Sequence, residues 1–135
     1  MSPRFSFTYV LCASLAVAGC ASAPTQQAIS SADYGTPMTP QECQTVAREH
    51  ITRLLKDPSS AQFRDEPSCD RGWSGKAPLL GMEAAFGYTQ TGQVNGKNAF
   101  GGYVGFRQYQ VLMRNGRVVR SCMADQNGLC LLTNR

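Results

Sequence analysis

The stretch from Gly92 to Phe106, GQVNGKNAFGGYVGF, holds five glycines, one lysine and three aromatic residues. Such a composition suits either a phosphate-binding loop or a corner of a β-sheet. A P-loop requires the pattern GxxxxGK followed by Ser or Thr, placed between a strand and a helix. Here the spacing from Gly92 to Gly96 is one residue short, and Asn98 stands where the hydroxyl residue belongs. The stretch is therefore not a P-loop.

The glycines instead predict turns between strands. Asn95-Gly96 and Gly101-Gly102 supply positive φ angles at low energetic cost. The side chains that such a loop presents are suited to recognising a protein or a glycan, and a purely architectural loop is the alternative. The candidate binding-loop residues are Lys97, Asn98, Phe100 and Tyr103.

No set of residues identifies a reaction. His50, the single histidine, is expected beside the apolar side of a helix, with no serine or cysteine assigned to it as a nucleophile. Asp65 and Glu66 are adjacent, so in extended chain their carboxylates point to opposite sides and cannot share acid–base work. We expect both carboxylates to be solvated and Ser59-Ser60 to form a turn. The sequence predicts no enzyme and no cofactor.

The first nineteen residues are typical of an export signal. Arg4 precedes an apolar stretch that is too short to span a bilayer comfortably and that ends in small residues. The sequence VAGC, ending at Cys20, resembles the bacterial lipobox, whose cysteine takes a diacylglycerol thioether before the signal is removed. This resemblance implies a lipoprotein signal peptide over residues 1–19 and lipid attachment, with palmitate-type chains, at Cys20. An ordinary secretory signal cut elsewhere is the alternative.

Two or three acyl chains on Cys20 would hold the protein stably at a membrane. Ala21 follows the cysteine, in place of the aspartate that commonly retains lipoproteins in the inner membrane. The resemblance therefore implies a protein anchored to the periplasmic face of the outer membrane. We expect its partner there to be an envelope protein or a glycan.

Four cysteines remain after Cys20. There is no CxxC pair and one histidine, which argues against zinc, and no metal site is predicted. An even number of cysteines in an exported domain is typical of two disulfides, for which three pairings exist. We favour a local bridge between Cys122 and Cys130, and a bridge from Cys43 to Cys69 that ties a helix to the chain after it.

The charge balance is mild. The chain has 13 Lys and Arg residues against 9 Asp and Glu residues, a formal net charge of +4. No run of basic residues follows a phosphate backbone, so nucleic-acid binding is not expected.

Three segments are expected along the chain. Residues 20–38 are rich in Ala, Ser, Thr, Gln and Pro and predict a lipidated flexible tether, with Tyr34 as the one bulky residue able to dock onto the domain. Thr39, Pro40 and Glu42 form a capping box that starts a helix, and Asp57-Pro58 ends it. Residues 67–81, punctuated by Gly and Pro, predict a loop.

From Met82 onward the pattern predicts strands. Asn115-Gly116 is the favoured type I′ hairpin turn, and counting from it places Met113 opposite Val118, Leu112 opposite Val119, and Val111 opposite Arg120. A second reversal is expected at Asn127-Gly128. The sum is a single small α+β domain over residues 39–135, with one N-terminal helix packed on an antiparallel sheet of three to four strands.

Two motifs resemble an uncharacterised family of small bacterial lipoproteins and exported domains. LKDPSSAQFR (55–64) matches its KDPxSAxF pattern, and residues 92–106 match GxVNxKNxxGGYxGF. Members often carry a cysteine before the second motif, where this chain has Thr91. The family has no agreed activity, so the resemblance implies fold and location alone. The resulting expectation is a membrane-anchored, non-enzymatic interaction or accessory module of the cell envelope. The alternative is a glycan-binding or lysozyme-inhibitor-like lipoprotein.

Overall fold

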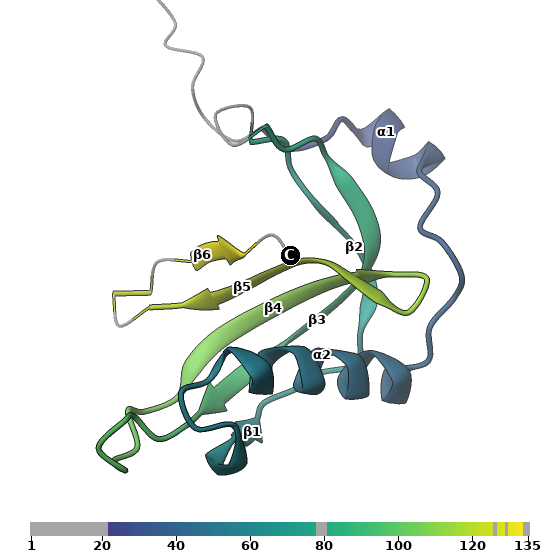
Figure 1. Ribbon diagram of the computed structural model, residues 1–135. Coiled ribbons are helices and arrows are strands. Elements are labelled where there is room, and N and C mark those ends of the chain that lie inside the picture. The colour runs from purple at the N-terminus through teal and green to yellow at the C-terminus, as the bar shows by residue number, and fades with distance from the viewer. Residues whose placement is uncertain (1–21, 78–80, 126, 129, 134–135) are drawn as a thin grey trace, which may run out of the picture.

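The computed structural model describes residues 22–77, 81–125, 127–128 and 130–133, so the expected signal peptide and Cys20 lie outside the described residues. Helix α2 lies across one face of a single antiparallel sheet (Figure 1). The α+β class is as expected. In chain order the elements are α1 (Gln26–Ser31), α2 (Pro40–Leu54), the 3-10 turn η1 (Pro58–Ser60), β1 (Gln62–Arg64), β2 (Asp70–Ser74), β3 (Ala85–Asn95), β4 (Arg107–Arg114), β5 (Arg117–Ala124) and β6 (Cys130–Thr133).

Helix α2 begins as the capping box predicts. The Thr39 hydroxyl accepts the Glu42 N–H at 3.3 Å, and the Glu42 carboxylate accepts the Thr39 N–H at 2.7 Å. The helix ends at Leu54, ahead of Asp57-Pro58. One side of it is buried against the sheet, through Cys43, Ala47 and Ile51.

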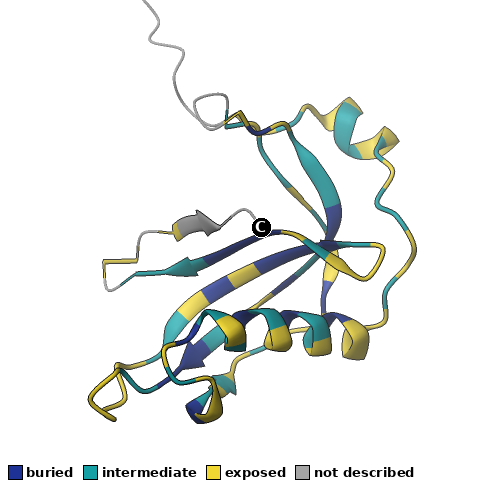
Figure 2. Cartoon of the chain, viewed as in Figure 1, coloured by how far each residue is buried: buried dark blue, intermediate teal, exposed yellow. Residues whose placement is uncertain are grey.

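The core fills the space between α2 and the sheet. The first part of strand β4 alternates, with Tyr109 and Val111 buried and Gln108 and Gln110 exposed, whereas Leu112 and Met113 are both buried (Figure 2). Such alternation is expected of a sheet that has one face covered by a helix and the other open to water. The outer face accordingly carries polar side chains such as Gln108 and Gln110, together with Leu112 and Trp73 around a shallow hollow.

Within the described residues the sheet has six strands, not three or four, and the helix packed on it is not the N-terminal one, because α1 precedes α2. The order is β1-β3-β4-β5-β6, and β2 pairs with the first half of β3. Strand β2 falls in the segment predicted to be a loop. Gly72 explains the error, because a Cβ there would collide with the Thr89 side chain across the strands. The glycine that marks a loop in the sequence is what lets this strand lie beside β3.

The hairpin of β4 and β5 turns at Asn115-Gly116, where both residues have positive φ, as predicted. Met113 lies opposite Val118, also as predicted, but a register shift follows between Leu112 and Met113. Leu112 therefore pairs with Arg120, and Val111 with Ser121, so the two remaining predicted pairs are wrong by one residue.

The shift decides which side chains of β5 are buried. Val119 is 37% exposed, whereas Arg120 is 9% exposed. The Arg120 guanidinium donates to the Ser74 hydroxyl at 2.8 Å and to the Gly75 carbonyl at 2.9 Å, and it also reaches the Glu83 carbonyl. Arg120 thereby holds the connection between β2 and β3 in place.

The described part of the expected tether, residues 22–38, is held against the domain. It contains α1, which Thr25 caps. The Tyr34 ring meets Phe86 edge-on with centroids 5.8 Å apart, and the Thr36 N–H donates to Asn115 at 2.8 Å. The described part of the expected flexible tether therefore contains a short capped helix and side chains docked on the domain, Tyr34 among them, although the segment is polar and has no hydrophobic period.

The start of this segment is fixed as well. Ser22 and Lys76 exchange two backbone hydrogen bonds of 3.2 and 3.1 Å. Figure 1 shows the chain entering beside the end of β2, at the opposite end of the sheet from the loop that joins β3 to β4. Among the described residues, no helix has the length and apolarity that crossing a bilayer requires.

Candidate functional site

The loop between β3 and β4 is organised around Asn98. Its Oδ1 accepts the N–H groups of Phe100 at 2.9 Å and Gly102 at 3.1 Å. Its own N–H donates to the Gly102 carbonyl at 2.8 Å, and its carbonyl accepts the Gly101 N–H at 3.1 Å. Gly101 has a φ of 82°, a conformation that favours glycine. The tip is thus a closed turn with its own hydrogen bonds.

The base of the loop is tied to the rest of the domain. The buried Asn95 side chain accepts the Gly105 N–H at 3.0 Å, and the Ser60 hydroxyl accepts the Lys97 N–H at 2.8 Å. Gly96 lies against Leu55, close enough that a Cβ would fall 3.1 Å from its Cδ1. Because Ser60 belongs to η1, the turn after α2 sets the position of the loop.

Three apolar or aromatic side chains of the loop pack little against the rest of the domain. Phe100 is 97% exposed, and Tyr103 and Val104 are 47% and 42% exposed. The Lys97 ammonium lies 5.4 Å from the centroid of the Tyr103 ring, within the range of a cation–π contact. The loop therefore presents apolar and cationic groups to solvent from a fixed backbone.

A hollow of about 520 Å³ lies beside the base of the loop. Its walls come from the end of α2, the loop, the start of β4 and the turn between β5 and β6. Its lining includes apolar groups from Leu55, Val104 and Phe106, and charged groups from Lys56, Lys97, Arg107 and Asp125.

The structure places the four predicted loop residues in two groups. Lys97 and Asn98 line the hollow, whereas Phe100 and Tyr103 are not part of its lining. The Asn98 oxygen is occupied by the loop's own N–H groups, so Lys97, Phe100 and Tyr103 are what the loop offers outward. Sequence reasoning missed Lys56 and Arg107, because only the tertiary fold brings them to Lys97.

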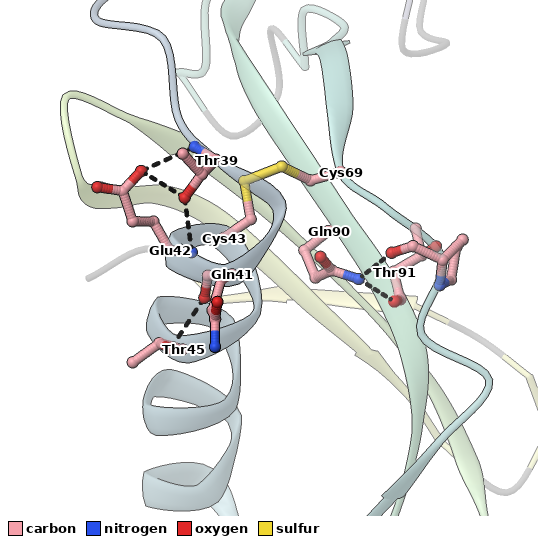
Figure 3. Close-up of a disulfide and its surroundings, with 9 residues drawn as sticks. Thr39, Gln41, Glu42, Cys43, Thr45, Cys69, Gln90 and Thr91 are labelled. Atoms are coloured by element: carbon pink, nitrogen blue, oxygen red, sulfur yellow. Dashed lines mark hydrogen bonds between the residues drawn. A yellow bond between two sulfur atoms is a disulfide. The ribbon is translucent and has the colours of Figure 1, made fainter.

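The four disulfide candidates are structural and lie away from the loop tip. The structure joins Cys43 to Cys69, with Cα atoms 6.2 Å apart, and this pairing confirms the prediction. Figure 3 shows the bridge linking the first turn of α2 to the chain just before β2. Cys122 is likewise joined to Cys130, with Cα atoms 5.4 Å apart, which ties β5 to β6.

The Gln90 side chain beside this bridge secures the same region. Its amide donates to the carbonyls of Pro67 and Thr91, at 2.8 Å each (Figure 3). Gln90 is 1% exposed, so these bonds satisfy a buried polar group.

His50 has a serine partner that the sequence did not reveal. Its Nε2 lies 2.8 Å from the Ser121 hydroxyl. Burial, and secondarily the charge of Arg53, holds the pKa of His50 below its ordinary value. A nucleophile–base pair has such geometry, but Ser121 is 2% exposed, so a substrate cannot reach its hydroxyl. The register shift in β5 puts Ser121 opposite Val111, which is why the pairing could not be counted from the turn.

Glu66 is buried, contrary to the expectation that it is solvated. Its side chain is 4% exposed and pairs with the Arg48 guanidinium, while the Tyr109 hydroxyl donates to it. Gln44 adds a bond of 3.3 Å. Burial and the bond to Glu66 hold the pKa of Tyr109 well above its ordinary value. Asp65 is exposed, as expected, and lies 3.5 Å from the Arg64 Nε, but its φ of 53° shows that the chain is not extended there, contrary to the expectation for the two carboxylates.

Glu66, Arg48 and Tyr109, together called the Glu66 cluster, link α2 to the sheet. It occupies space over Gly92, where a Cβ would lie 2.7 Å from both Glu66 Cγ and Tyr109 Oη. The first glycine of the loop motif is therefore required by packing under this cluster.

Within the described residues, no three His, Cys, Asp or Glu side chains are grouped so that they could hold a metal ion. Comparison of the chain with protein-family models, curated proteins and solved structures gave no match.

Proposed function

We propose that the protein is a lipid-anchored lipoprotein of the cell envelope that acts as a non-enzymatic interaction module, with the loop of residues 96–106 as its contact surface. The observation that carries the proposal is a contrast within the loop. The backbone is held by Asn95, Asn98 and Ser60, yet Phe100 is 97% exposed. A preorganised loop loses little entropy on binding, and an exposed ring supplies apolar area for a partner pocket.

The anchor rests on the sequence around Cys20. Acyl chains on this residue would hold the domain at the periplasmic face of the outer membrane, and two disulfides suit that oxidising compartment. Cys20→Ala is expected to release the protein from the membrane fraction. Cys12→Ala, within the expected signal peptide, is the matched control and should leave it bound. Membrane association of the Cys20→Ala protein would overturn the anchor.

The burial of Ser121 supports a non-enzymatic role. The His50–Ser121 pair is the arrangement among the described residues that comes nearest to a nucleophile and its base, and its hydroxyl is enclosed by the fold. A binding function needs no such group.

The loop is tested by capture of an envelope protein from solubilised membranes. Phe100→Ser removes the exposed ring, and Val119→Ser removes an exposed apolar side chain from β5 as the control. We expect a discrete partner to be retained by the wild-type protein and by Val119→Ser, and lost with Phe100→Ser. Equal capture by all three proteins would exclude the loop tip as the contact.

A glycan is the second candidate partner, favoured by the open face of the sheet. A hollow of about 360 Å³ on this face is lined by Trp73, Ser74, Gln110 and Arg120, among others. Trp73 is 38% exposed and offers a ring for a sugar face, beside hydroxyl and amide groups. Binding to insoluble peptidoglycan that depends on Trp73 and not on Phe100 would favour this candidate, and inhibition of lysozyme would favour its inhibitor form.

A further inference from the structure

We propose that the hollow beside the loop is a binding site for an oxyanion group, a carboxylate or a phosphate, carried by a ligand with an apolar part. This inference deepens the proposed function, on which it rests, because it assigns a ligand chemistry to the same end of the molecule. The site is formed by Lys56, Lys97 and Arg107, which come from the segment just after α2, the loop and the start of β4.

Among the described residues, the cations of the hollow form no salt bridge, although the hydrogen bond from the Ser59 hydroxyl first, and the charge of Lys97 as a smaller cause, lower the pKa of the nearby Asp57. Elsewhere, Arg48, Arg64, Lys76 and Arg114 each pair with a carboxylate. Within the described part of the chain, by contrast, no ion pair involves Lys56, Lys97 or Arg107. Lys97 contacts the Tyr103 ring, which still leaves its ammonium donors available.

Arg107 gives the strongest indication. Its side chain is half-buried, and its Nε is fully buried with no hydrogen-bond acceptor among the described residues. A buried donor without an acceptor is unfavourable, and the guanidinium geometry matches the two oxygens of a carboxylate or phosphate. Arg107 also lines the hollow, so its guanidinium is the group from which an oxyanion there would accept hydrogen bonds.

Two carboxylates lie near these cations, and each is engaged in a turn. Asp125 accepts the Asn127 N–H at 2.8 Å. Asp57 accepts the N–H and hydroxyl of Ser59 at 3.1 and 2.6 Å. The cations still outnumber the carboxylates, so the local field favours an anion.

The remaining lining restricts the ligand further. Leu55, Val104 and Phe106 give the hollow apolar walls, and about 520 Å³ is within the usual range for a small-molecule site. A free inorganic ion would leave these walls unused. A short peptide or a sugar acid, which joins a carboxylate to methyl or ring carbons, would use both.

The position of the hollow distinguishes the sources of the oxyanion. Ser22, two residues after Cys20, is fixed to Lys76, which follows β2. Figure 1 shows that this end of β2 lies opposite the loop between β3 and β4, whose residues line the hollow. The eleven residues of β3 separate the two ends by about 35 Å. A domain anchored at Cys20 would direct the hollow away from its own bilayer. We therefore infer a carboxylate-bearing cell-wall or soluble ligand, not a lipid headgroup of that membrane.

The test is an amide-shift titration of the purified full-length protein in micelles of an uncharged detergent. Citrate and inorganic phosphate are the probes, with sodium chloride at matched ionic strength as the reference. We expect saturable shifts at Lys56, Lys97 and Arg107 with the oxyanions alone, and binding about tenfold weaker or more in Arg107→Gln. Shifts equal to those with chloride would overturn the proposal.

Two further variants guard against misfolding. Lys56→Gln alters an exposed side chain of the hollow and should also weaken binding, whereas Arg117→Gln, on the exposed hairpin tip, should not. Equal weakening by Lys56→Gln and Arg117→Gln would indicate a general charge effect and overturn the site.

Vesicles separate the sources. For this comparison the lipidated protein is reconstituted into phosphatidylglycerol vesicles in place of micelles. Soluble cell-wall fragments are expected to compete with citrate, and the phosphatidylglycerol of the vesicles is not. Competition by the vesicles that is lost in Arg107→Gln would overturn the assignment to a cell-wall or soluble ligand. The source of the ligand is inferred from the anchor at Cys20, but the titration and its variants depend on neither the lipid anchor nor Phe100, so failure of the site is distinguishable from failure of the proposed function.

Discussion

The side-chain oxygen of Asn98 accepts the N–H of Phe100 at 2.9 Å, while the ring of Phe100 remains 97% exposed. Order in the backbone thus coincides with full exposure of the side chain. An aromatic ring held in this way is available to a partner without a large entropy loss on binding.

Substitution of Asn98 should therefore affect stability, whereas substitution of Phe100 should affect binding and leave stability almost unchanged. Asn98→Ala removes the acceptor of two N–H groups and should lower the free energy of unfolding by about 1 kcal/mol. Phe100→Ala should change it by less than about 0.5 kcal/mol. Urea denaturation measures both. A Phe100→Ala protein that is less stable than Asn98→Ala would mean that the ring packs against the fold.

Gly92 is predicted to be intolerant of a side chain. Its Cβ would fall 2.7 Å from Glu66 and Tyr109, and these groups cannot move without breaking the buried pair with Arg48. Gly92→Ala should lower the free energy of unfolding by about 2 kcal/mol or more. Gly102→Ala is the matched control, because its nearest neighbour would be 3.8 Å away. Equal effects of the two substitutions in urea would contradict this packing.

Stability should depend on pH through His50. Its pKa lies below the ordinary 6.5 in the fold, because of burial first and Arg53 second, so the unfolded chain binds the proton more tightly. The stability that this difference provides is present above about pH 6.5 and is lost as the pH falls toward the folded pKa.

The measurement is the free energy of unfolding between about pH 8 and pH 5. We expect a decline below about pH 6.5 that is reduced in His50→Gln. The carboxylates with lowered pKa, on Asp33, Glu42 and Asp57, lose their contribution at lower pH and do not obscure this window. An identical decline in His50→Gln would show that another group is responsible.

The two disulfides should differ in their effect on stability. Cys43 and Cys69 are 26 residues apart and both are buried, whereas Cys122 and Cys130 are 8 apart. A longer loop loses more unfolded-state entropy when closed, so replacing Cys43 and Cys69 by Ala should cost about 3 kcal/mol and more than replacing the other pair. Thermal unfolding of the two double variants tests the order, and the reverse order would contradict this assignment.

The sequence correctly predicted the elements that are determined by contacts between residues close together in the chain. Thr39 and Glu42 cap α2 through contacts three residues apart, and Asn115-Gly116 forces its own turn. Such features need no tertiary information, and both were correctly predicted.

The predictions were wrong where contacts between segments far apart in the sequence determine the structure. Strand β2 pairs with β3 because Gly72 leaves space for the Thr89 side chain. The register shift beside Met113 directs the Arg120 side chain to backbone carbonyls of the segment between β2 and β3. Glu66 is buried because Arg48 and Tyr109 reach it from other elements. A charged residue next to a turn carries no sign of such partners.

The candidate site was predictable only in part. The glycine-rich loop was identified from its composition, with Lys97 and Phe100 among its residues. Its hollow could not be foreseen, because Lys56 and Arg107 are 41 and 10 residues from Lys97 in the chain and meet it only in the folded domain.

The most direct test of the proposed contact surface is photocrosslinking in living cells. A photoreactive residue at position 100 is compared with one at Glu49, an exposed position on α2; Arg48 is unsuitable because it holds Glu66. We predict a discrete protein adduct from position 100 and none from position 49. A stable, membrane-bound protein that gives no adduct from position 100, or gives the same adduct from both positions, would contradict the loop as the interaction surface.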